Sequence, residues 1–386
     1  MTIYFVAGEV SADNHGAALM RSLRELDGKL NFVGRGGPQM QKVAAEPFKN
    51  WIGEAAVLGL WEVLRKYGYF REQFHEALHE IRESKPDAVV LIDYPGFNLR
   101  LAGALRRQAP RQKIIYYISP QVWAWNRGRI KRMAQSIDLV LCIFPFETDI
   151  YSQAGLPALF VGHPMIERLR ARKIDRVRDR NLIALFPGSR SREVRKIFPV
   201  MLDTARELRK HNPNLRFEVA AASHELAREM QKMTPLPLPR GKGMGANSED
   251  QQLIQIKLGE TAAIMQRAWA GIVASGSATL EAAYFRLPFV LIYKVAWPTY
   301  LAARLVVNVK YLGMPNLLAD EEVVPEFIQH RAKPSAIVKA VRPLIENANA
   351  RERMISQLDA IVPKLGDSGA SQRAARAIIE EIGSAT

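Results

Sequence analysis

The sequence predicts an α/β protein with two Rossmann-like, doubly wound parallel sheets. Short apolar runs of strand length alternate with helical segments along most of the chain. The two halves also open alike, each with a strand, a sharp turn and a helix. A length of 386 residues favours two domains. We expect an N-terminal domain over 1–170, a second over 171–350, and a C-terminal helical segment over 351–386 that packs back over the body.

Composition and charge narrow the functional classes. Hydrophobic residues make up 48% and charged residues 24%, as in ordinary soluble proteins. The single cysteine, Cys142, lies in an apolar run and is expected to be an inert buried thiol. The N-terminus enters a strand directly, without a signal peptide, and we expect a cytoplasmic protein. A net charge of +15 fits nucleic acid, an anionic membrane surface or phosphorylated substrates.

The first half begins with the strand Thr2–Ala7, a turn from Gly8 to Asp13 and a helix. The segment 35–38 is Gly-rich and is expected to be an irregular loop. The apolar run Ala88–Ile92 predicts a central strand that ends at Asp93. Because open α/β sheets bind ligands beyond the carboxyl ends of their strands, Asp93 is either a catalytic carboxylate or a cap of the turn. Further strands are expected at 31–34, 113–118, 138–143 and 159–161.

Segment 57–71 carries an apolar stripe wider than a surface helix needs, interleaved with basic residues. A core helix and a helix that enters a lipid interface both fit this pattern. Downstream, a Pro-containing loop holds Trp123 and Trp125, which could stack a ring or a lipid or could plug the end of the sheet. The stripe consists of Val57, Leu58, Leu60, Trp61, Leu64 and Phe70.

The second half opens with LIALFPGSRSREVRK at 182–196, an apolar strand that stops at Pro187-Gly188 before a helix. Such a helix N-terminus suits an anion, and Arg190 adds a fork for phosphate oxygens. A second helix opens at Ser275-Gly276-Ser277, with Glu281 in its first turns. Together these turns predict a site for a diphosphate with an attached ribose. Glu281 would accept hydrogen bonds from the ribose hydroxyls. Further strands are expected at 217–222, 254–257, 271–274 and 289–293.

The remaining segments give weaker signals. The charged segment 168–180 lacks a periodic apolar face and indicates a linker. The segment 314–318 is expected to be an extended loop, followed by an acidic patch that includes Glu326. The chain has no phosphate-binding loop of the GxxxxGK[ST] type, no GxGxxG after its first strand and no His/Cys cluster at ligand spacing. We therefore expect no metal and no cofactor.

These motifs, taken in order, resemble the lipid-A-disaccharide synthase family. They are Gly8-Glu9 with Ser11 and Asp13, VLGLWEVL, Ile92-Asp93 with Pro95 and Phe97-Asn98, SPQVWAW, LFPGSR, ASGSATLE and PNLLA. The resemblance implies a glycosyltransferase-B fold, with two Rossmann-like domains facing across a cleft. It also implies an inverting transfer of 2,3-diacylglucosamine from UDP to the 6-hydroxyl of 2,3-diacylglucosamine 1-phosphate, which gives a β-1,6 disaccharide of lipid A biosynthesis.

The resemblance also implies roles for individual residues. Asp93 would be the general base, and Arg190 would stabilise the departing UDP without a metal. The apolar stripe would face acyl chains at the inner surface of the cytoplasmic membrane. Acceptor and UDP-sugar donor would contact Gly8, Glu9, Ser11, Asp13, Asn98, Ser189, Ser275, Gly276, Ser277, Glu281 and Asn316.

The chain departs from the family pattern at Ala12, at Gly96 and at Asp320-Glu321. Two alternatives stay open beside the resemblance. A UDP-sugar 2-epimerase shares the fold but gives no reason for the apolar stripe. A nucleic-acid-binding protein would explain the charge and the tryptophans but would leave the paired strand–turn–helix openings without a use. The resemblance implies no nucleic-acid partner, and the sequence leaves a homo-oligomer open.

Overall fold

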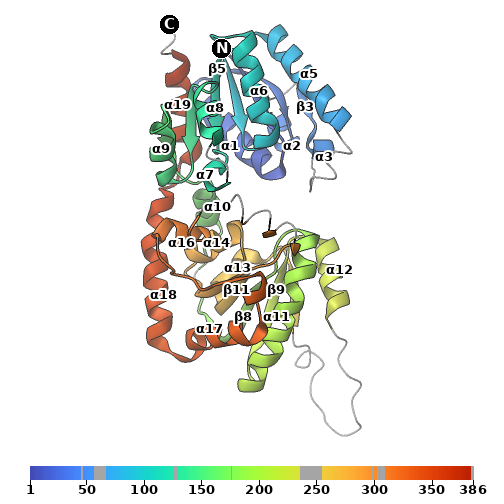
Figure 1. Ribbon diagram of the computed structural model, residues 1–386, viewed down its shortest axis with the longest axis vertical. Coiled ribbons are helices and arrows are strands. Elements are labelled where there is room, and N and C mark those ends of the chain that lie inside the picture. Colours follow the sequence, from blue (N-terminus) through green and yellow to red (C-terminus); the bar gives the residue numbers. More distant parts are fainter. Residues whose placement is uncertain are drawn as a thin grey trace. The chain divides into compact units, whose positions relative to one another are not determined.

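The computed structural model describes residues 1–44, 47–55, 67–125, 128–174, 176–234, 254–297, 300–301, 304 and 309–383. The chain forms two compact units, and each has its own parallel sheet (Figure 1). The first unit contains Met1–Glu167 and Leu365–Thr386, and the second contains Arg168–Lys364. The C-terminal segment 351–386 is thus divided between the units, at Lys364 and Leu365.

The first unit is built on a seven-stranded sheet in the order β3-β2-β1-β4-β5-β6-β7. All neighbouring strands are parallel, and the central ones are buried on both faces, which is why they are continuously apolar in sequence. The strands are β1 (Thr2–Ala7), β2 (Asn31–Gly36), β3 (Phe48–Asn50), β4 (Ala88–Ile92), β5 (Lys113–Tyr117), β6 (Leu139–Cys142) and β7 (Ala158–Phe160).

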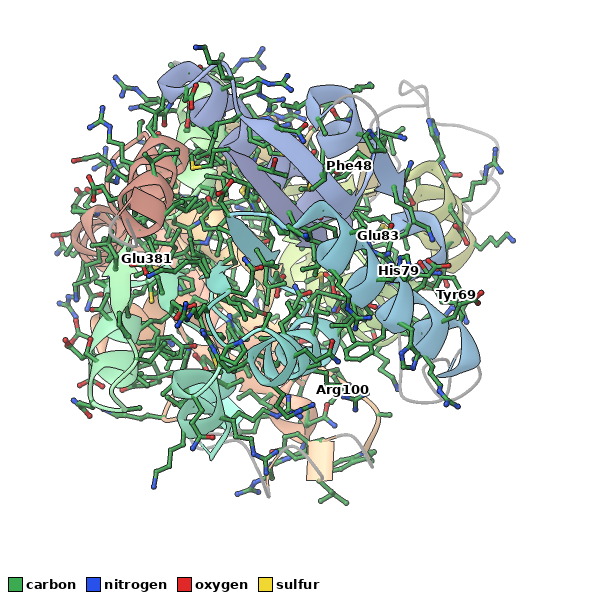
Figure 2. The ribbon with its side chains drawn as sticks, turned by 90° about the horizontal axis from the view of Figure 1, so that it is seen from above. Phe48, Tyr69, His79, Glu83, Arg100 and Glu381 are labelled. Atoms are coloured by element: carbon green, nitrogen blue, oxygen red, sulfur yellow. The ribbon has the colours of Figure 1, made fainter. Side chains whose placement is uncertain are left out.

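Helices cover both faces of this sheet. On one face α1 (Val10–Leu26) packs against α2 (Pro38–Ala44) and α19 (Ala370–Gly383), over a core that includes Phe5 and Ile92. Lys113 on β5 donates to Glu381 of α19 at 2.6 Å, and Figure 2 marks Glu381 on that helix. A second group of neighbouring helices is α5 (Tyr67–Ser84), α6 (Pro95–Gln108) and α8 (Gly128–Ala134). Shorter helices are α3 (Ile52–Ala55), α7 (Val122–Trp125), α9 (Pro145–Ser152) and α10 (Met165–Ala171).

The second unit has a six-stranded parallel sheet in the order β10-β9-β8-β11-β12-β13. The long helix α11 packs along α17, while α14, α16 and α18 pack together. The strands are β8 (Asp179–Phe186), β9 (Arg216–Ala221), β10 (Ile254–Leu258), β11 (Ala268–Ala274), β12 (Phe289–Tyr293) and β13 (Glu326–Ile328). The helices are α11 (Ser191–His211), α12 (His224–Met233), α13 (Thr261–Arg267), α14 (Ser277–Tyr284), α16 (Met314–Ala319), α17 (Pro334–Glu346) and α18 (Ala348–Ile361).

Both sheets reverse their strand order at one point. In the first unit the chain leaves β1 towards β2 and returns to β4 on the other side, and in the second unit β8 and β11 stand in the same relation. Loops diverge at such a switch point, so the carboxyl edge there stays open. The prediction of two doubly wound parallel sheets is confirmed.

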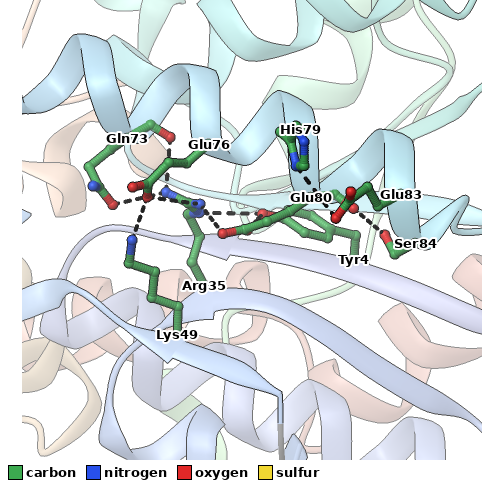
Figure 3. Close-up of polar contacts among 9 residues, drawn as sticks. All are labelled: Tyr4, Arg35, Lys49, Gln73, Glu76, His79, Glu80, Glu83 and Ser84. Atoms are coloured by element: carbon green, nitrogen blue, oxygen red, sulfur yellow. Dashed lines mark hydrogen bonds and ion pairs between the residues drawn. The ribbon is translucent and has the colours of Figure 1, made fainter.

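Segment 35–38 is regular, contrary to the expected loop, because β2 continues to Gly36 and α2 begins at Pro38. The cause is Arg35, which is fully buried and tied to α5 (Figure 3). Its guanidinium donates to the Gln73 carbonyl oxygen at 2.9 Å, to Glu80 Oε1 at 2.6 Å and to the Tyr4 hydroxyl at 3.3 Å. The Tyr4 hydroxyl in turn donates to Glu80. This cluster joins β1, β2 and α5.

Two further expectations from the sequence are wrong. The segment around 314–318 is the helix α16 instead of an extended loop, with Pro315 in its first turn. The charged segment 168–180 is no plain linker, because Arg178 is half-buried and donates to the carbonyl oxygens of Met265, Ala268 and Phe285. Burial lowers the pKa of Arg178 to about 10. None of the helices in the described ranges is long and apolar enough to cross a membrane.

We expect Arg35→Ala to lower the free energy of unfolding by about 3–5 kcal/mol, since it leaves Glu80 and the Gln73 carbonyl without their buried partner. Urea unfolding followed by circular dichroism measures this change. Arg82→Ala removes an exposed arginine from α5, the helix that carries Gln73 and Glu80, and serves as the control, with an expected change within about 0.5 kcal/mol. Equal effects of the two substitutions would contradict the anchoring role.

Candidate functional site

The turn after β4 places Asp93 at the first switch point in a strained backbone. Asp93 and Tyr94 have φ values of 46° and 50°, in the left-handed region that side chains other than glycine rarely adopt. The Asp93 amide donates to the Tyr117 carbonyl at 3.1 Å, while its own carbonyl accepts from Asn98 Nδ2 at 2.8 Å and from the Tyr116 hydroxyl. The surrounding structure therefore fixes this turn.

Asn98, predicted to contact substrate, is fully buried beneath this turn. Its side-chain nitrogen donates to the backbone carbonyls of Ile92 and Asp93 at 3.2 and 2.8 Å. These bonds give Asn98 a positioning role for Asp93, from the first turns of α6.

The same turn rests on an aromatic cluster that sequence reasoning missed. A Cβ atom at Gly8 would lie 2.4 Å from the Tyr94 ring, so only glycine at the end of β1 admits this ring. The Trp51 indole donates to the Ala7 carbonyl at 2.7 Å and packs on Tyr94 and Phe97, with ring centroids 6.0 and 5.0 Å away. The available signal was the aromatic residue directly after Asp93.

The environment of Asp93 makes its carboxylate more basic than usual. Burial and, to a lesser degree, the nearby charge of Glu9 raise the pKa of Asp93 to about 6, although a hydrogen bond from the Tyr94 amide partly offsets both effects. Glu9 itself is exposed, in the turn between β1 and α1. A carboxylate whose pKa lies near neutrality, at an open sheet edge, can accept a proton from a bound hydroxyl.

Two other predicted residues of the N-terminal turn, Ser11 and Asp13, differ in their exposure to solvent. Ser11 is exposed on the first turn of α1. Asp13 is 2% exposed and accepts hydrogen bonds from the amides of Gly37, Gln39 and Met40 at 3.0, 3.0 and 2.9 Å. Asp13 therefore caps the N-terminus of α2, and the structure shows it in a structural contact.

Arg190 lies at the second switch point, as the residue preceding α11. Its side chain is 60% exposed and lies 3.5 Å from Glu193. Gly188 has a φ of 110°, and a Cβ there would come within 2.5 Å of Glu193 Oε2. Because an exposed ion pair of this kind is weak, the Arg190 guanidinium can turn towards an anion. Ser189 is exposed beside it.

The neighbouring strand β11 leads into the second predicted turn. Gly276 has a φ of 145° and precedes α14, with Gly276 and Ser277 exposed and Ser275 half-buried. Since β8 and β11 pair directly, the N-termini of α11 and α14 open at the same sheet edge. The structure thus brings Ser189, Arg190 and the 275–277 turn together, as an anion site of two helix N-termini requires.

Glu281 has a partner that the sequence did not suggest. Arg168 on α10 donates to Glu281 Oε1 at 2.8 Å, and the Glu281 side chain is only 13% exposed. A carboxylate accepts through both oxygens, so this pairing orients Glu281 and is compatible with a further hydroxyl donor.

Asn316 lies on α16, is fully buried and bonds to the segment that follows this helix. Its oxygen accepts from the amides of Val323 and Val324 at 2.9 and 2.8 Å, and its nitrogen donates to the Val324 carbonyl and to Glu326. Glu326 also accepts from two backbone amides near α16, so it belongs to this network and not to a surface acidic patch. These bonds make Asn316 a structural residue of the second unit.

The loop after β5 is fastened by buried groups. Trp123 is 4% exposed and donates from its indole to Glu147 Oε1 at 3.0 Å. Burial raises the pKa of Glu147 to about 7, and the other Glu147 oxygen accepts from the Phe144 amide at 3.1 Å. Of the two alternatives for Trp123, plugging the sheet end is what the structure shows. The side chain of Trp125 lies outside the described residues.

The apolar stripe lies almost entirely outside the described residues. Its only described member is Phe70, half-buried on α5 against the Tyr69 ring. No group of His, Cys, Asp and Glu within the described ranges could hold a metal ion. Cys142 is a buried free thiol whose pKa burial raises far above its usual value.

Comparisons with known proteins agree on one family. The profile of lipid-A-disaccharide synthetase matches residues 3–379. The lipid-A-disaccharide synthase of Geobacter sulfurreducens is 36% identical over 392 residues, which cover 99% of this chain and 97% of that protein.

Two solved structures resemble the fold. A putative UDP-N-acetylglucosamine 2-epimerase from Listeria monocytogenes superposes with a TM-score of 0.62 at 11% identity, covering 99% of this chain and 96% of that one. The calicheamicin glycosyltransferase CalG4 gives a TM-score of 0.56 at 12% identity, covering 99% of each chain. Identities this low show the fold alone, which is that of the glycosyltransferase-B class.

We expect Asp93→Asn to stabilise the protein at neutral pH. Because folding raises the pKa of Asp93 to about 6, ionisation above that pH costs folding free energy, up to about 3 kcal/mol. The advantage of the variant should therefore be full at pH 8, shrink as the pH falls through 6 and vanish near pH 4. Urea unfolding at these three pH values measures it, with the exposed Asp149→Asn as control. A variant less stable at every pH would instead indicate that Asp93 caps the turn.

Proposed function

Because the chain belongs to the lipid-A-disaccharide synthetase family, we propose that it joins two acylated glucosamine units. The donor is UDP-2,3-diacylglucosamine, the acceptor is 2,3-diacylglucosamine 1-phosphate, and the products are the β-1,6-linked disaccharide 1-phosphate and UDP. One observation carries the chemistry: a turn at the switch point of each unit holds a candidate group, a half-buried carboxylate of raised pKa in the first unit and an arginine beside helix N-termini in the second.

The acceptor is activated in the first unit. Asp93 takes the proton of the 6-hydroxyl as the oxygen forms its bond to the anomeric carbon of the donor, and the bond from that carbon to the UDP oxygen breaks. Attack from the face opposite the leaving group inverts the anomeric centre. The raised pKa of Asp93 supports this role, since a carboxylate with a pKa of about 6 is a better base than an unperturbed one and is still ionised at neutral pH.

The leaving diphosphate is stabilised in the second unit. The positive dipole ends of α11 and α14 and the Arg190 guanidinium offset the negative charge that develops on UDP. Glu281, oriented by Arg168, accepts from ribose hydroxyls. These groups account for the departure of UDP through residues of the chain itself.

The alternatives have less support. A 2-epimerase resembles this chain only in fold, at 11% identity, whereas a lipid-A-disaccharide synthase is 36% identical over almost the whole length. A nucleic-acid-binding role would draw on the net charge of +15 but leaves the raised pKa of Asp93 without a use.

Association with an anionic membrane surface is part of the proposal. Acylated substrates reside in membranes, and segment 57–71 combines a wide apolar stripe with Arg65, Lys66 and Arg71. The support for this step comes from the sequence, because most of the stripe lies outside the described residues.

Asp93→Asn tests the proposed function directly. With both acylated substrates in detergent micelles, the wild type should release UDP, and the variant should lose about a hundred- to ten-thousandfold in turnover because it cannot accept the proton. The log of wild-type kcat/KM should fall by about one unit per pH unit below pH 6. The affinity for UDP, measured by thermal shift, should be unchanged. A stable variant with undiminished turnover would exclude Asp93 as the base, and a wild type that releases no UDP would exclude the function.

Arg190→Ala tests the leaving-group role. Losing one charged donor to the departing diphosphate should lower kcat at least about a hundredfold, while the stability changes little because the side chain is 60% exposed. Arg206→Ala, which removes an exposed arginine on α11, is the control and should keep wild-type turnover. Single-turnover UDP release separates chemistry from substrate binding. If both variants turn over equally fast, Arg190 has no such role.

A further inference from the structure

The turn that precedes α11 already holds an anion of the chain itself, the carboxylate of Glu193. The chain passes from Gly188 to Arg190, the residue before α11, and Glu193 lies in the first turn of that helix. A Cβ atom at Gly188 would lie 2.5 Å from Glu193 Oε2 and 3.1 Å from the Glu193 Cβ, so the carboxylate rests directly on the backbone of the turn. Glu193 Oε1 lies 3.5 Å from Arg190 Nη1, and the Glu193 side chain is only 24% exposed.

The charge of Glu193 also reaches the second turn of the proposed UDP site. The strands in this part of the sheet stand in the order β8-β11-β12, and the Ser275 amide donates to the Ile292 carbonyl at 3.0 Å. Burial raises the pKa of Tyr293 at the end of β12, the charge of Glu193 adds to this rise, and the charge of Arg190 opposes it. Charges that come from the turn after β8 and act on β12 extend across the end of β11. Glu193 and Arg190 therefore lie beside the turn that follows β11.

A carboxylate at this position and a bound diphosphate compete for the same positive charges. The positive end of a helix and a guanidinium attract any anion, and the Glu193 carboxylate lies beside both of them. A diphosphate in the site would stand next to that carboxylate, and like charges a few ångströms apart repel each other. The diphosphate gains the full attraction of Arg190 only when the pair of Arg190 and Glu193 separates. Ion pairs with an exposed partner are weak enough to exchange in this way.

We propose that Glu193 is a competing carboxylate, which occupies the anion position at the start of α11, leaves when the diphosphate of the donor binds and returns as UDP dissociates. The inference rests on the proposed function and deepens it by assigning a residue to product release. Transfer of the sugar turns the terminal phosphate of the donor from a diester into a monoester, whose charge at neutral pH is about −1.5 to −2. Glu193 therefore repels the product UDP more strongly than the UDP-sugar.

The test compares Glu193→Gln with the control Asp203→Asn. Glutamine keeps the shape of the side chain and removes its charge. Asp203 is an exposed carboxylate on α11 that likewise pairs with an arginine, Arg206, at 2.7 Å. In calorimetric titrations Glu193→Gln should bind UDP at least about tenfold more tightly than the wild type, and the control should match the wild type. This difference should shrink in about 1 M salt, because screening weakens an electrostatic competition.

Turnover and stopped-flow measurements examine the release step. With both acylated substrates, the inhibition constant of UDP should fall at least about tenfold in Glu193→Gln, and the KM for the UDP-sugar should fall by less than about threefold. The rate of UDP dissociation should decrease by about the factor by which the affinity rises. A residue that only stabilises the helix would change neither the salt dependence nor the difference between UDP and UDP-sugar.

Two results would overturn the inference. Wild-type affinity for UDP in Glu193→Gln, together with lower stability in urea unfolding, would make Glu193 a cap of α11. Weaker UDP binding together with a lower kcat would make Glu193 a residue that positions Arg190. If the wild type binds UDP without joining acylated substrates, and Glu193→Gln still binds UDP more tightly, the proposed reaction is wrong and the competing carboxylate stands. A wild type that binds neither UDP nor inorganic pyrophosphate would overturn both.

Discussion

The reversal of strand order in each sheet is the constraint on which the chemistry of this chain depends. Loops that leave neighbouring strands in opposite directions cannot cover the edge between them, so the residues there stay reachable. In the first unit that edge carries Asp93, and in the second it carries Arg190 and the 275–277 turn. Elsewhere in the described chain, helices cover the faces of the two sheets.

Burial and hydrogen bonding differ among the predicted site residues. Asp13 and Asn316 belong to motifs of the family, yet each is buried and satisfied by backbone groups of its own unit. Leaving such a group unpaired costs about 1–3 kcal/mol, so these bonds hold a loop in one conformation. Asp93 is different, because its carbonyl and amide are fixed while its carboxylate is held at a raised pKa. Ionisation of this carboxylate therefore destabilises the folded state, and hydrogen bonds such as those from Asn98 hold the turn in place.

Periodicity was enough to predict the fold, because most strands here are apolar runs bounded by turn residues. The short strands β3 and β13 carry too few residues for a pattern, and α16 begins with Met-Pro-Asn, which suggests a loop in isolation. Family and function are confirmed by full-length similarity, while the roles of individual site residues stay predictions. Contacts across the chain were out of reach: nothing in sequence links Asp13 to the amides near Met40, or Arg168 to Glu281. Such pairs arise from tertiary packing, which local patterns do not contain.

The basic residues that give the net charge of +15 lie in different environments. Arg35 and Arg178 donate hydrogen bonds inside their own units, so their charges are not available to a ligand. Asp93 is in the opposite situation, because burial and the charge of Glu9 raise its pKa. A phosphorylated acceptor bound near this turn would add negative charge and push that pKa higher, which would protonate the base at neutral pH. The proposed reaction therefore needs basic side chains close enough to the phosphate to offset this charge.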